Sequence, residues 1–332
     1  MQESQKWLRH FSKFTVFSTL CLIFIGALVK SHEVGLSVPD WPTTYGYNMF
    51  TFPLDEMVGG VFYEHSHRLF ASFVGMLTII LAIWIQIIEK RMWLKKIGFI
   101  ALGLVIIQGL FGGLTVIFFL PTAISMIHGV IAQTFLLLLI FIAFCLSNEY
   151  FNGFSNYPSK NNQLISKWSI LMLSVVFIQL ILGAWMRHIN AGLAIPDFPT
   201  VGWSWLPIIN ENTLHKINDW RFENDFPIIS LGPIIVHLVH RIWAGVVLLT
   251  IFIFGYQYFR GNREFNPTVF FLHLGVIFQI LLGAITVWSG KDPLITSLHV
   301  ANGAILLGLS FLTVLRYSFK MTQLRNISIA AK

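Results

Sequence analysis

Four of the 11 histidines lie in strongly apolar segments and form two pairs, His67 with His128 and His240 with His299. Two imidazoles that project from separate helices of a bundle can hold a haem iron as its axial ligands. A lone histidine in a membrane often makes only a hydrogen bond between helices, and this structural alternative stays open. Zinc would need a third or fourth ligand, which only the first pair has nearby. The paired pattern favours two haem sites.

A carboxylate precedes the first pair. Glu64 lies three residues before His67, so on a helix both side chains share one face, about a turn apart. The corresponding residue of the second pair is His237. A carboxylate within a membrane is costly without a partner, and one reading is an ion pair with Arg68 or Lys30. The other reading is a catalytic group that moves protons or orients a substrate beside a bound porphyrin.

An arginine directly follows one histidine of each pair, Arg68 after His67 and Arg241 after His240. Because both halves of the pattern contain it, we expect a role that both sites share. Guanidinium groups form strong paired hydrogen bonds with carboxylates. Arg68 and Arg241 are therefore candidate partners for haem propionates.

The elements that position these side chains are long apolar helices. Hydrophobic residues make up 55% of the 332 residues and charged residues 11%, against roughly a quarter charged in a soluble domain. The net charge of +7 comes from basic residues between apolar runs, which indicates contact with membrane lipid and not with nucleic acid. A span needs about 20 apolar residues. We predict an all-α integral membrane fold with eight transmembrane helices near residues 14–30, 61–88, 97–118, 122–146, 167–187, 233–257, 268–288 and 294–316.

The distribution of Lys and Arg predicts the orientation. They concentrate at the N-terminus, at the C-terminus and in the connections after every second helix, which places both termini in the cytoplasm. The long loops 31–60 and 188–232 then face outward. The short basic N-terminus is followed by an apolar run without a small-residue cleavage site, so we expect a first membrane helix. The absence of a long presequence favours the bacterial cytoplasmic membrane.

The chain repeats itself. The segment Gly35-Leu36-Ser37-Val38-Pro39-Asp40-Trp41-Pro42-Thr43 corresponds to Gly192-Leu193-Ala194-Ile195-Pro196-Asp197-Phe198-Pro199-Thr200, at an offset of 157 residues. Further on, Gln108, Gly112 and His128 correspond to Gln279, Gly283 and His299, at an offset of 171 residues. Each half has an even number of spans, so both run the same way through the membrane. The pattern predicts two tandem four-helix bundles, residues 1–150 and 151–332, related by a pseudo-twofold axis along the membrane normal.

Over nearly its whole length the chain resembles the haem A synthase family, membrane enzymes that convert haem O to haem A. The resemblance rests on Glu64-His65-Ser66-His67-Arg68, Gln108, Gly112-Gly113-Leu114-Thr115, His128, Ala132-Gln133, the two Pro-Asp-(Trp/Phe)-Pro loops, His240-Arg241 and His299. It implies an eight-helix fold. It also implies that successive hydroxylations oxidise the C8 methyl of haem O to a formyl group, which gives haem A for terminal oxidases.

The resemblance also implies roles for the two pairs. His67 and His128 would hold the substrate haem O, with Glu64 as the catalytic residue. His240 and His299 would hold a permanent haem b that passes electrons. The electron donor is not implied, whereas a haem O synthase and oxidase assembly factors are expected partners.

One departure concerns cysteine. Some members of the family carry a cysteine pair in an outer loop, but Cys21 and Cys145 both lie in apolar runs here. The chain therefore resembles the cysteine-lacking class.

Two other functions would also use four such histidines: a di-haem membrane cytochrome b that carries electrons, and a haem chaperone or transporter. Neither needs the difference between Glu64 and His237. An electron carrier would also usually place haems at both membrane faces, whereas these histidines share one level. The roles of His65, His188, His215 and His237 are left open.

Overall fold

Eight helices in the computed structural model are long and apolar enough to cross a membrane. The structure describes residues 3–151, 162–206, 208–261 and 265–330, and within these ranges it contains helices and no extended strand, only two isolated β-bridges. The eight helices are α1 (Glu3–Ser31), α2 (Gly59–Ile88), α3 (Met92–Ile117), α4 (Thr122–Cys145), α6 (Asn162–His188), α8 (Leu231–Gly261), α9 (Pro267–Trp288) and α10 (Pro293–Ala330). The predicted all-α membrane fold with eight spans is confirmed.

The first and last helices extend well beyond their predicted spans. α1 begins at Glu3 and not near residue 14, and α10 continues to Ala330 and not to residue 316. The prediction counted apolar residues that fill the hydrocarbon layer, whereas backbone hydrogen bonding continues a helix into polar surroundings. The other six helices lie within a few residues of their predicted spans.

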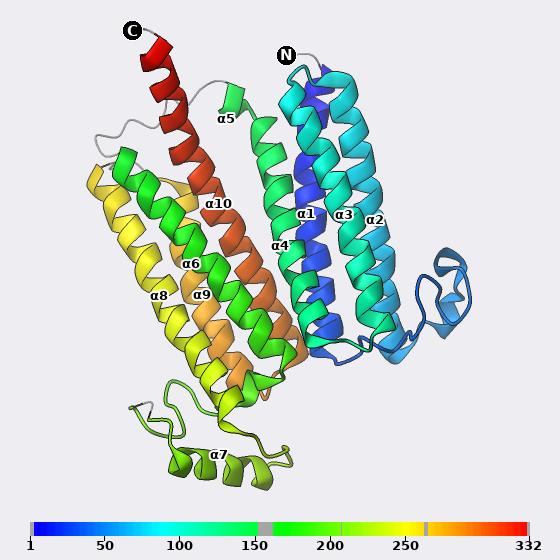
Figure 1. Cartoon of the computed structure of the whole chain (residues 1–332), viewed down its shortest axis with the longest axis vertical. Coiled ribbons are helices and arrows are strands. Elements are labelled where there is room, and N and C mark those ends of the chain that lie inside the picture. The colour runs from blue at the N-terminus through cyan, green and yellow to red at the C-terminus, as the bar shows by residue number, and fades with distance from the viewer. Residues whose placement is uncertain (1–2, 152–161, 207, 262–264, 331–332) are drawn as a thin grey trace.

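The helices pack as two rings of four. In the first ring α1 contacts α2, α2 contacts α3, α3 contacts α4 and α4 contacts α1; in the second, α6, α8, α9 and α10 contact one another in the same order (Figure 1). Each ring has a hydrophobic core of its own, one around Leu81 and Ile142 and one around Phe254 and Leu307.

Contacts between the rings join α10 to α1 and α4, and α4 to α6. If α1 is exchanged with α6 and α4 with α10, the same three contacts result, as a twofold relation between the rings would require. The axis itself stays a prediction. The predicted boundary between residues 150 and 151 falls within the one-turn helix α5 (Asn148–Phe151), which directly precedes residues outside the described ranges.

Both chain ends lie at one end of the bundle, and both long loops lie at the other, called here the loop end (Figure 1). The loop between α1 and α2 contains two short 3-10 helices, Met49–Thr51 and Leu54–Glu56. The loop between α6 and α8 contains a third, Ala191–Leu193, and the helix α7 (Glu211–Glu223). Both long loops are thus ordered around short helices.

The sequence analysis missed α7 because the segment is polar and has no apolar run. Its start does carry a local signal: the side chain of Asn210 accepts a hydrogen bond from the backbone N–H of Thr213, and Glu211 lies in the first turn. An Asn cap followed by an acidic residue is typical of a helix N-terminus. This signal would have predicted the helix.

Candidate haem sites

Each of the first two histidines lies against a glycine of a neighbouring helix. His67 on α2 faces Gly26 of α1, and His128 on α4 faces Gly112 of α3. A Cβ atom on Gly26 would lie 2.9 Å from Cε1 of His67, and one on Gly112 would lie 3.3 Å from Cε1 of His128. Because both distances are shorter than ordinary van der Waals contact, glycine provides the space that each imidazole occupies.

The second ring repeats this arrangement. His240 on α8 faces Gly183 of α6, and His299 on α10 faces Gly283 of α9. A Cβ atom on either glycine would lie 3.1 Å from Cε1 of the facing histidine. The four histidines that the sequence paired therefore have matching surroundings in the two rings.

Within each ring the two histidines lie on helices that are diagonal to each other, α2 and α4 or α8 and α10. All four lie within the first three turns of helices that start at the loop end. Side chains from diagonal helices at one level can approach a disc-shaped ligand in the ring from opposite sides. The arrangement therefore suits a ligand held between two imidazoles.

The donor set of each ring fits haem. In the described part of the chain, no three His, Cys, Asp or Glu side chains gather as a site for a metal ion. The Nδ1 atoms of His67 and His128 are buried without a hydrogen-bond partner among the described residues. Haem iron needs only two axial ligands from the protein, whereas zinc needs three or four. The imidazoles of His67 and His128 thus have unused hydrogen-bonding capacity, and each ring offers the two histidines that a haem iron needs.

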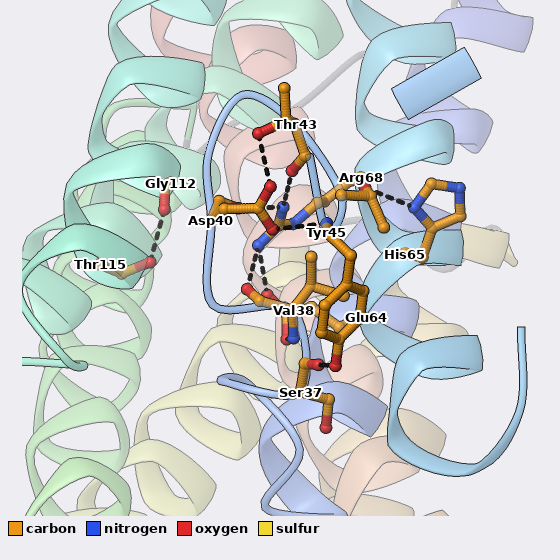
Figure 2. A network of polar contacts seen from close by, with 11 residues as sticks. Ser37, Val38, Asp40, Thr43, Tyr45, Glu64, His65, Arg68, Gly112 and Thr115 are labelled. Carbon is orange, nitrogen blue, oxygen red and sulfur yellow. Dashed lines mark hydrogen bonds and ion pairs between the residues drawn. The ribbon is translucent and has the colours of Figure 1, made fainter. Parts of the chain in front are cut away.

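Glu64 lies in a buried polar network that docks the first long loop onto α2 (Figure 2). Its Oε1 accepts a hydrogen bond from Nη2 of Arg68 at 2.6 Å, and its Oε2 accepts one from the backbone N–H of Val38 at 2.8 Å. Lys30 instead donates to Oδ1 of Asn190 at 3.4 Å. Of the two ion pairs considered from sequence, the one with Arg68 is present.

Arg68 also binds the loop directly. Nη1 donates to the carbonyl oxygens of Asp40 and Thr43 at 2.7 and 3.0 Å, and Nη2 donates to that of Val38 at 2.8 Å. Together with Glu64, these acceptors match the four N–H groups on the two terminal nitrogens. The observed contacts assign Arg68 to loop docking, so its expected role as a propionate partner stays a prediction that this geometry does not favour.

The second ring has a corresponding network, with a histidine in place of the glutamate and two loop carbonyl acceptors for the arginine in place of three. Nη1 and Nη2 of Arg241 donate to the carbonyl oxygens of Thr200 and Ile195, each at 3.0 Å. His237 occupies the position of Glu64: its Nδ1 lies 3.2 Å from the backbone N of Ile195, and its Nε2 lies 3.0 Å from Nε of Arg241. Glu64 and His237 therefore share a structural role that the sequence comparison did not reveal.

The two residues differ in charge and in hydrogen-bonding capacity. A carboxylate accepts from both donors at once, whereas a neutral imidazole has a single acceptor nitrogen. His237 can therefore satisfy the backbone N–H of Ile195 or the guanidinium of Arg241, but not both. The first ring has a fully satisfied anion at this point and the second has an uncharged group with one donor unmatched.

The Pro-Asp-x-Pro segments are turns stabilised by their aspartates. The carboxylate of Asp40 accepts hydrogen bonds from the backbone N–H groups of Tyr45 and Gly46 at 2.8 and 2.9 Å, and from the Thr43 hydroxyl at 2.5 Å. Burial alone would raise the pKa of Asp40, but the hydrogen bonds from Gly46, Thr43 and Tyr45 outweigh it and hold that pKa below its usual value.

Asp197 makes the matching turn in the second loop, where it accepts from the backbone N–H groups of Gly202 and Trp203 at 2.9 and 2.8 Å. Both turns also contain a cis peptide bond, Trp41–Pro42 in one and Phe198–Pro199 in the other. The acidic residues of the repeated motif therefore shape the loops and do not point to metal binding.

The first loop also packs against α3 at the loop end. The Trp41 side chain lies so close to Gly113 of α3 that a Cβ there would be 2.5 Å from the indole ring. His65, whose role the sequence left open, is buried with its Nδ1 3.0 Å from the Thr44 hydroxyl. His65 thus belongs to the loop-docking network.

The amino-acid sequence of this chain is similar to those of known proteins. A family model described as cytochrome oxidase assembly protein, COX15-CtaA, matches residues 9–311. The chain is 25% identical to the haem A synthase of Pelagibacter ubique, with 92% of this chain and 95% of that protein covered. It is also 25% identical to the haem A synthase of Halalkalibacterium halodurans (90% and 93% covered) and 28% identical to that of an Exiguobacterium species (89% and 88% covered). The chain therefore belongs to the COX15-CtaA family of cytochrome oxidase assembly proteins.

Proposed function

We propose that this protein is a haem A synthase, an oxidoreductase that converts the C8 methyl group of haem O to the formyl group of haem A. The observation that carries the proposal is the pair of matched histidine sites: Glu64, three residues before His67, is a buried carboxylate, and in the described part of the chain the second site has His237 at the corresponding position. The relatives that cover most of the chain are named haem A synthases, and this supports the same reaction here.

In this proposal the first ring binds the substrate. His67 and His128 hold haem O between diagonal helices, and the glycines Gly26 and Gly112 leave room for both imidazoles. Glu64, three residues before His67 on α2, provides the carboxylate that accepts or returns a proton during the hydroxylations. Its ion pair with Arg68 at 2.6 Å holds the carboxylate in a fixed position on α2.

The second ring binds the cofactor. His240 and His299 hold haem b, which when bound supplies one-electron transfer to the substrate site. Arg241 is the better propionate partner of the two arginines. Each of its three nitrogens has one acceptor in the structure, so one further N–H on each terminal nitrogen can meet a carboxylate.

We further propose that the protein lies in the bacterial cytoplasmic membrane with both termini in the cytoplasm. The relatives named above are bacterial, and the loop end that carries the four histidines then faces outward. Haem O is apolar and would pass directly from a haem O synthase. Oxidase assembly factors would receive the product.

The sharpest test is pigment analysis in a host that makes haem O but not haem A. Expression of the full chain should produce haem A or its hydroxylated intermediate in extracted haems, resolved by chromatography. His67→Ala, which removes a proposed substrate ligand, is the matched negative control. If only haem B is bound and haem O persists unchanged with a working reductant, the protein is not a haem A synthase.

The same experiment separates the two alternative functions. An electron-carrying cytochrome b or a haem chaperone would bind haem through the same histidines without changing it. The position of all four histidines near one end of the bundle argues against a carrier across the membrane, which would need haems at both faces. The proposed enzyme needs only two neighbouring sites at one level.

A further inference from the structure

Amide side chains bind three of the four histidines, and they do so most completely in the second ring. Nε2 of Gln279 lies 3.2 Å from Nε2 of His299 and donates to the backbone carbonyl of that residue at 3.0 Å. Asn302, one turn further along α10, donates to Oε1 of Gln279 at 2.7 Å and to the carbonyl oxygen of Gly275 at 2.9 Å. Asn302 thus holds the side chain of Gln279 in place, and Gln279 in turn contacts His299.

The other histidine of this ring has an amide of its own. Nε2 of Gln179 on α6 lies 3.3 and 3.4 Å from the ring nitrogens of His240 and donates to its backbone carbonyl at 3.0 Å. The hydrogen bonds from Gln179 and Gln279 to the backbone carbonyls of the histidines can form whichever ring nitrogen would bind an iron atom. Both histidines of the second ring are therefore attached to a neighbouring helix by a side-chain amide.

The first ring retains only one of these three amides. Gln108 contacts Nε2 of His128 at 3.3 Å and its carbonyl oxygen at 3.1 Å. Its Oε1, like that of Gln179, is buried without a partner in the described part of the chain, whereas Oε1 of Gln279 accepts from Asn302. The repeat offsets place Ile131 at the position of Asn302 and Leu22 at that of Gln179. Neither isoleucine nor leucine can donate a hydrogen bond.

We propose that Gln179, Gln279 and Asn302 are positioning residues that make the second site a permanent haem site, and that their partial loss makes the first site one from which haem exchanges. This inference rests on the proposed function, because an enzyme that changes a haem must release one pigment and keep the other. An imidazole with a fixed orientation rebinds iron readily after a transient dissociation, whereas an unrestrained one turns away.

The competing explanation is that these amides only join helices, as polar side chains in membrane proteins often do. The two explanations predict different effects when the amide side chains are substituted. Amides that only join helices would alter thermal stability and leave haem retention and ligand geometry unchanged. Positioning residues would alter retention and the ligand field of the iron.

The test exchanges the residues between the rings. Asn302→Ile and Gln179→Leu give the second ring the residues of the first, and the double variant Leu22→Gln with Ile131→Asn does the reverse. Full-length protein is purified with its haem, and transfer of haem to excess apomyoglobin is followed by absorbance. Thr134→Val on α4, whose hydroxyl bonds only within its own helix in the structure, is the control.

We expect Asn302→Ile and Gln179→Leu each to release haem b about tenfold faster, roughly the effect of one lost hydrogen bond. The low-spin electron paramagnetic resonance signal of that haem should also shift or broaden. The reverse double variant should slow loss of haem from the first ring. A variant that fails to fold would lose its helical circular dichroism, and the other single variant then decides the result.

Failure of the positioning inference is distinguishable from failure of the proposed function. If the wild-type protein makes haem A but all exchanged variants release haem at rates within about twofold of wild type, only the positioning inference is wrong. If the wild-type protein retains no haem with a bis-histidine spectrum, the proposed function fails first.

Discussion

At the scale of single residues, the two halves differ at Glu64 and His237, which occupy equivalent places in the loop-docking networks. The equivalence supplies a test that separates structure from catalysis. Glu64→His gives the first ring the residue that the second ring already uses to dock its loop. We expect this variant to keep its loop docked and its haem b spectrum intact while it forms less than about 1% of the product, because a group for general acid–base catalysis is worth about 10²–10⁴-fold.

The reciprocal variant His237→Glu is the matched control. A carboxylate would accept from both Ile195 and Arg241, so this variant should dock its loop at least as firmly and keep its activity. Haem extraction measures product, and limited proteolysis of the loops measures docking. Full activity of Glu64→His would show that Glu64 is structural only.

A second residue-scale prediction concerns the glycines that face the histidines. Gly26→Ala would place a methyl group 2.9 Å from Cε1 of His67, so the imidazole must move and haem binding in the first ring should fall at least about tenfold. Gly75→Ala on α2 is the control, since its Cβ would meet no atom within 4 Å. The haem content of each purified variant shows whether the close packing of Gly26 against His67 matters specifically, or whether any alanine in these helices has the same effect. Equal haem contents in the two variants would contradict a requirement for glycine at residue 26.

At the scale of elements, the Asp40 turn predicts a pH dependence of the first long loop. The pKa of Asp40 in the folded loop is lowered, so its hydrogen bonds stabilise the turn above the ordinary value of about 4, and this stabilisation is lost as the pH falls through the lowered pKa. Hydrogen exchange at the amides of Tyr45 and Gly46, corrected for the intrinsic rate, should show protection that declines below that value. Asp40→Asn should remove the dependence, and persistence of the decline in that variant would assign it to another group.

The elements also show what the sequence could predict. The apolar runs and the repeat determined the eight spans, and the levels of His67, His128, His240 and His299 followed from their distance to the helix starts. The ion pair of Arg68 with Glu64 was among the readings of the sequence. The other contacts of Arg68 were not predictable, because those partners are backbone carbonyls of a loop 25 to 30 residues away, and no residue type indicates a carbonyl acceptor. The role of Asn302 was missed for a similar reason: its counterpart is Ile131, so a comparison that searches for matching residues passes over it.

At the scale of the whole molecule, the two rings meet near the level of the histidines. Arg187 at the end of α6 donates to the carbonyl oxygen of Ala27 at 2.6 Å and to the Ser31 hydroxyl at 2.9 Å, both on α1. Ser297 of α10 lies 3.0 Å from the same hydroxyl. These contacts join the rings at the loop end, beside both candidate haem sites. The proposed division of work between a cofactor ring and a substrate ring needs such a connection, because electrons must pass from one to the other.

That division predicts that substitutions in either ring abolish product formation but differ in their effect on the haem b spectrum. His240→Ala or His299→Ala should abolish the low-spin haem b spectrum and, with it, product formation, because the first ring then has no source of electrons. His67→Ala or His128→Ala should abolish product formation and leave the haem b spectrum of the second ring in place. Absorption and electron paramagnetic resonance spectra of the purified full-length variants, read beside their extracted haems, measure both effects. A haem b spectrum that survives both second-ring substitutions but disappears with either first-ring substitution would reverse the assignment of the rings, and Glu64 would then lie beside the cofactor and not beside the substrate.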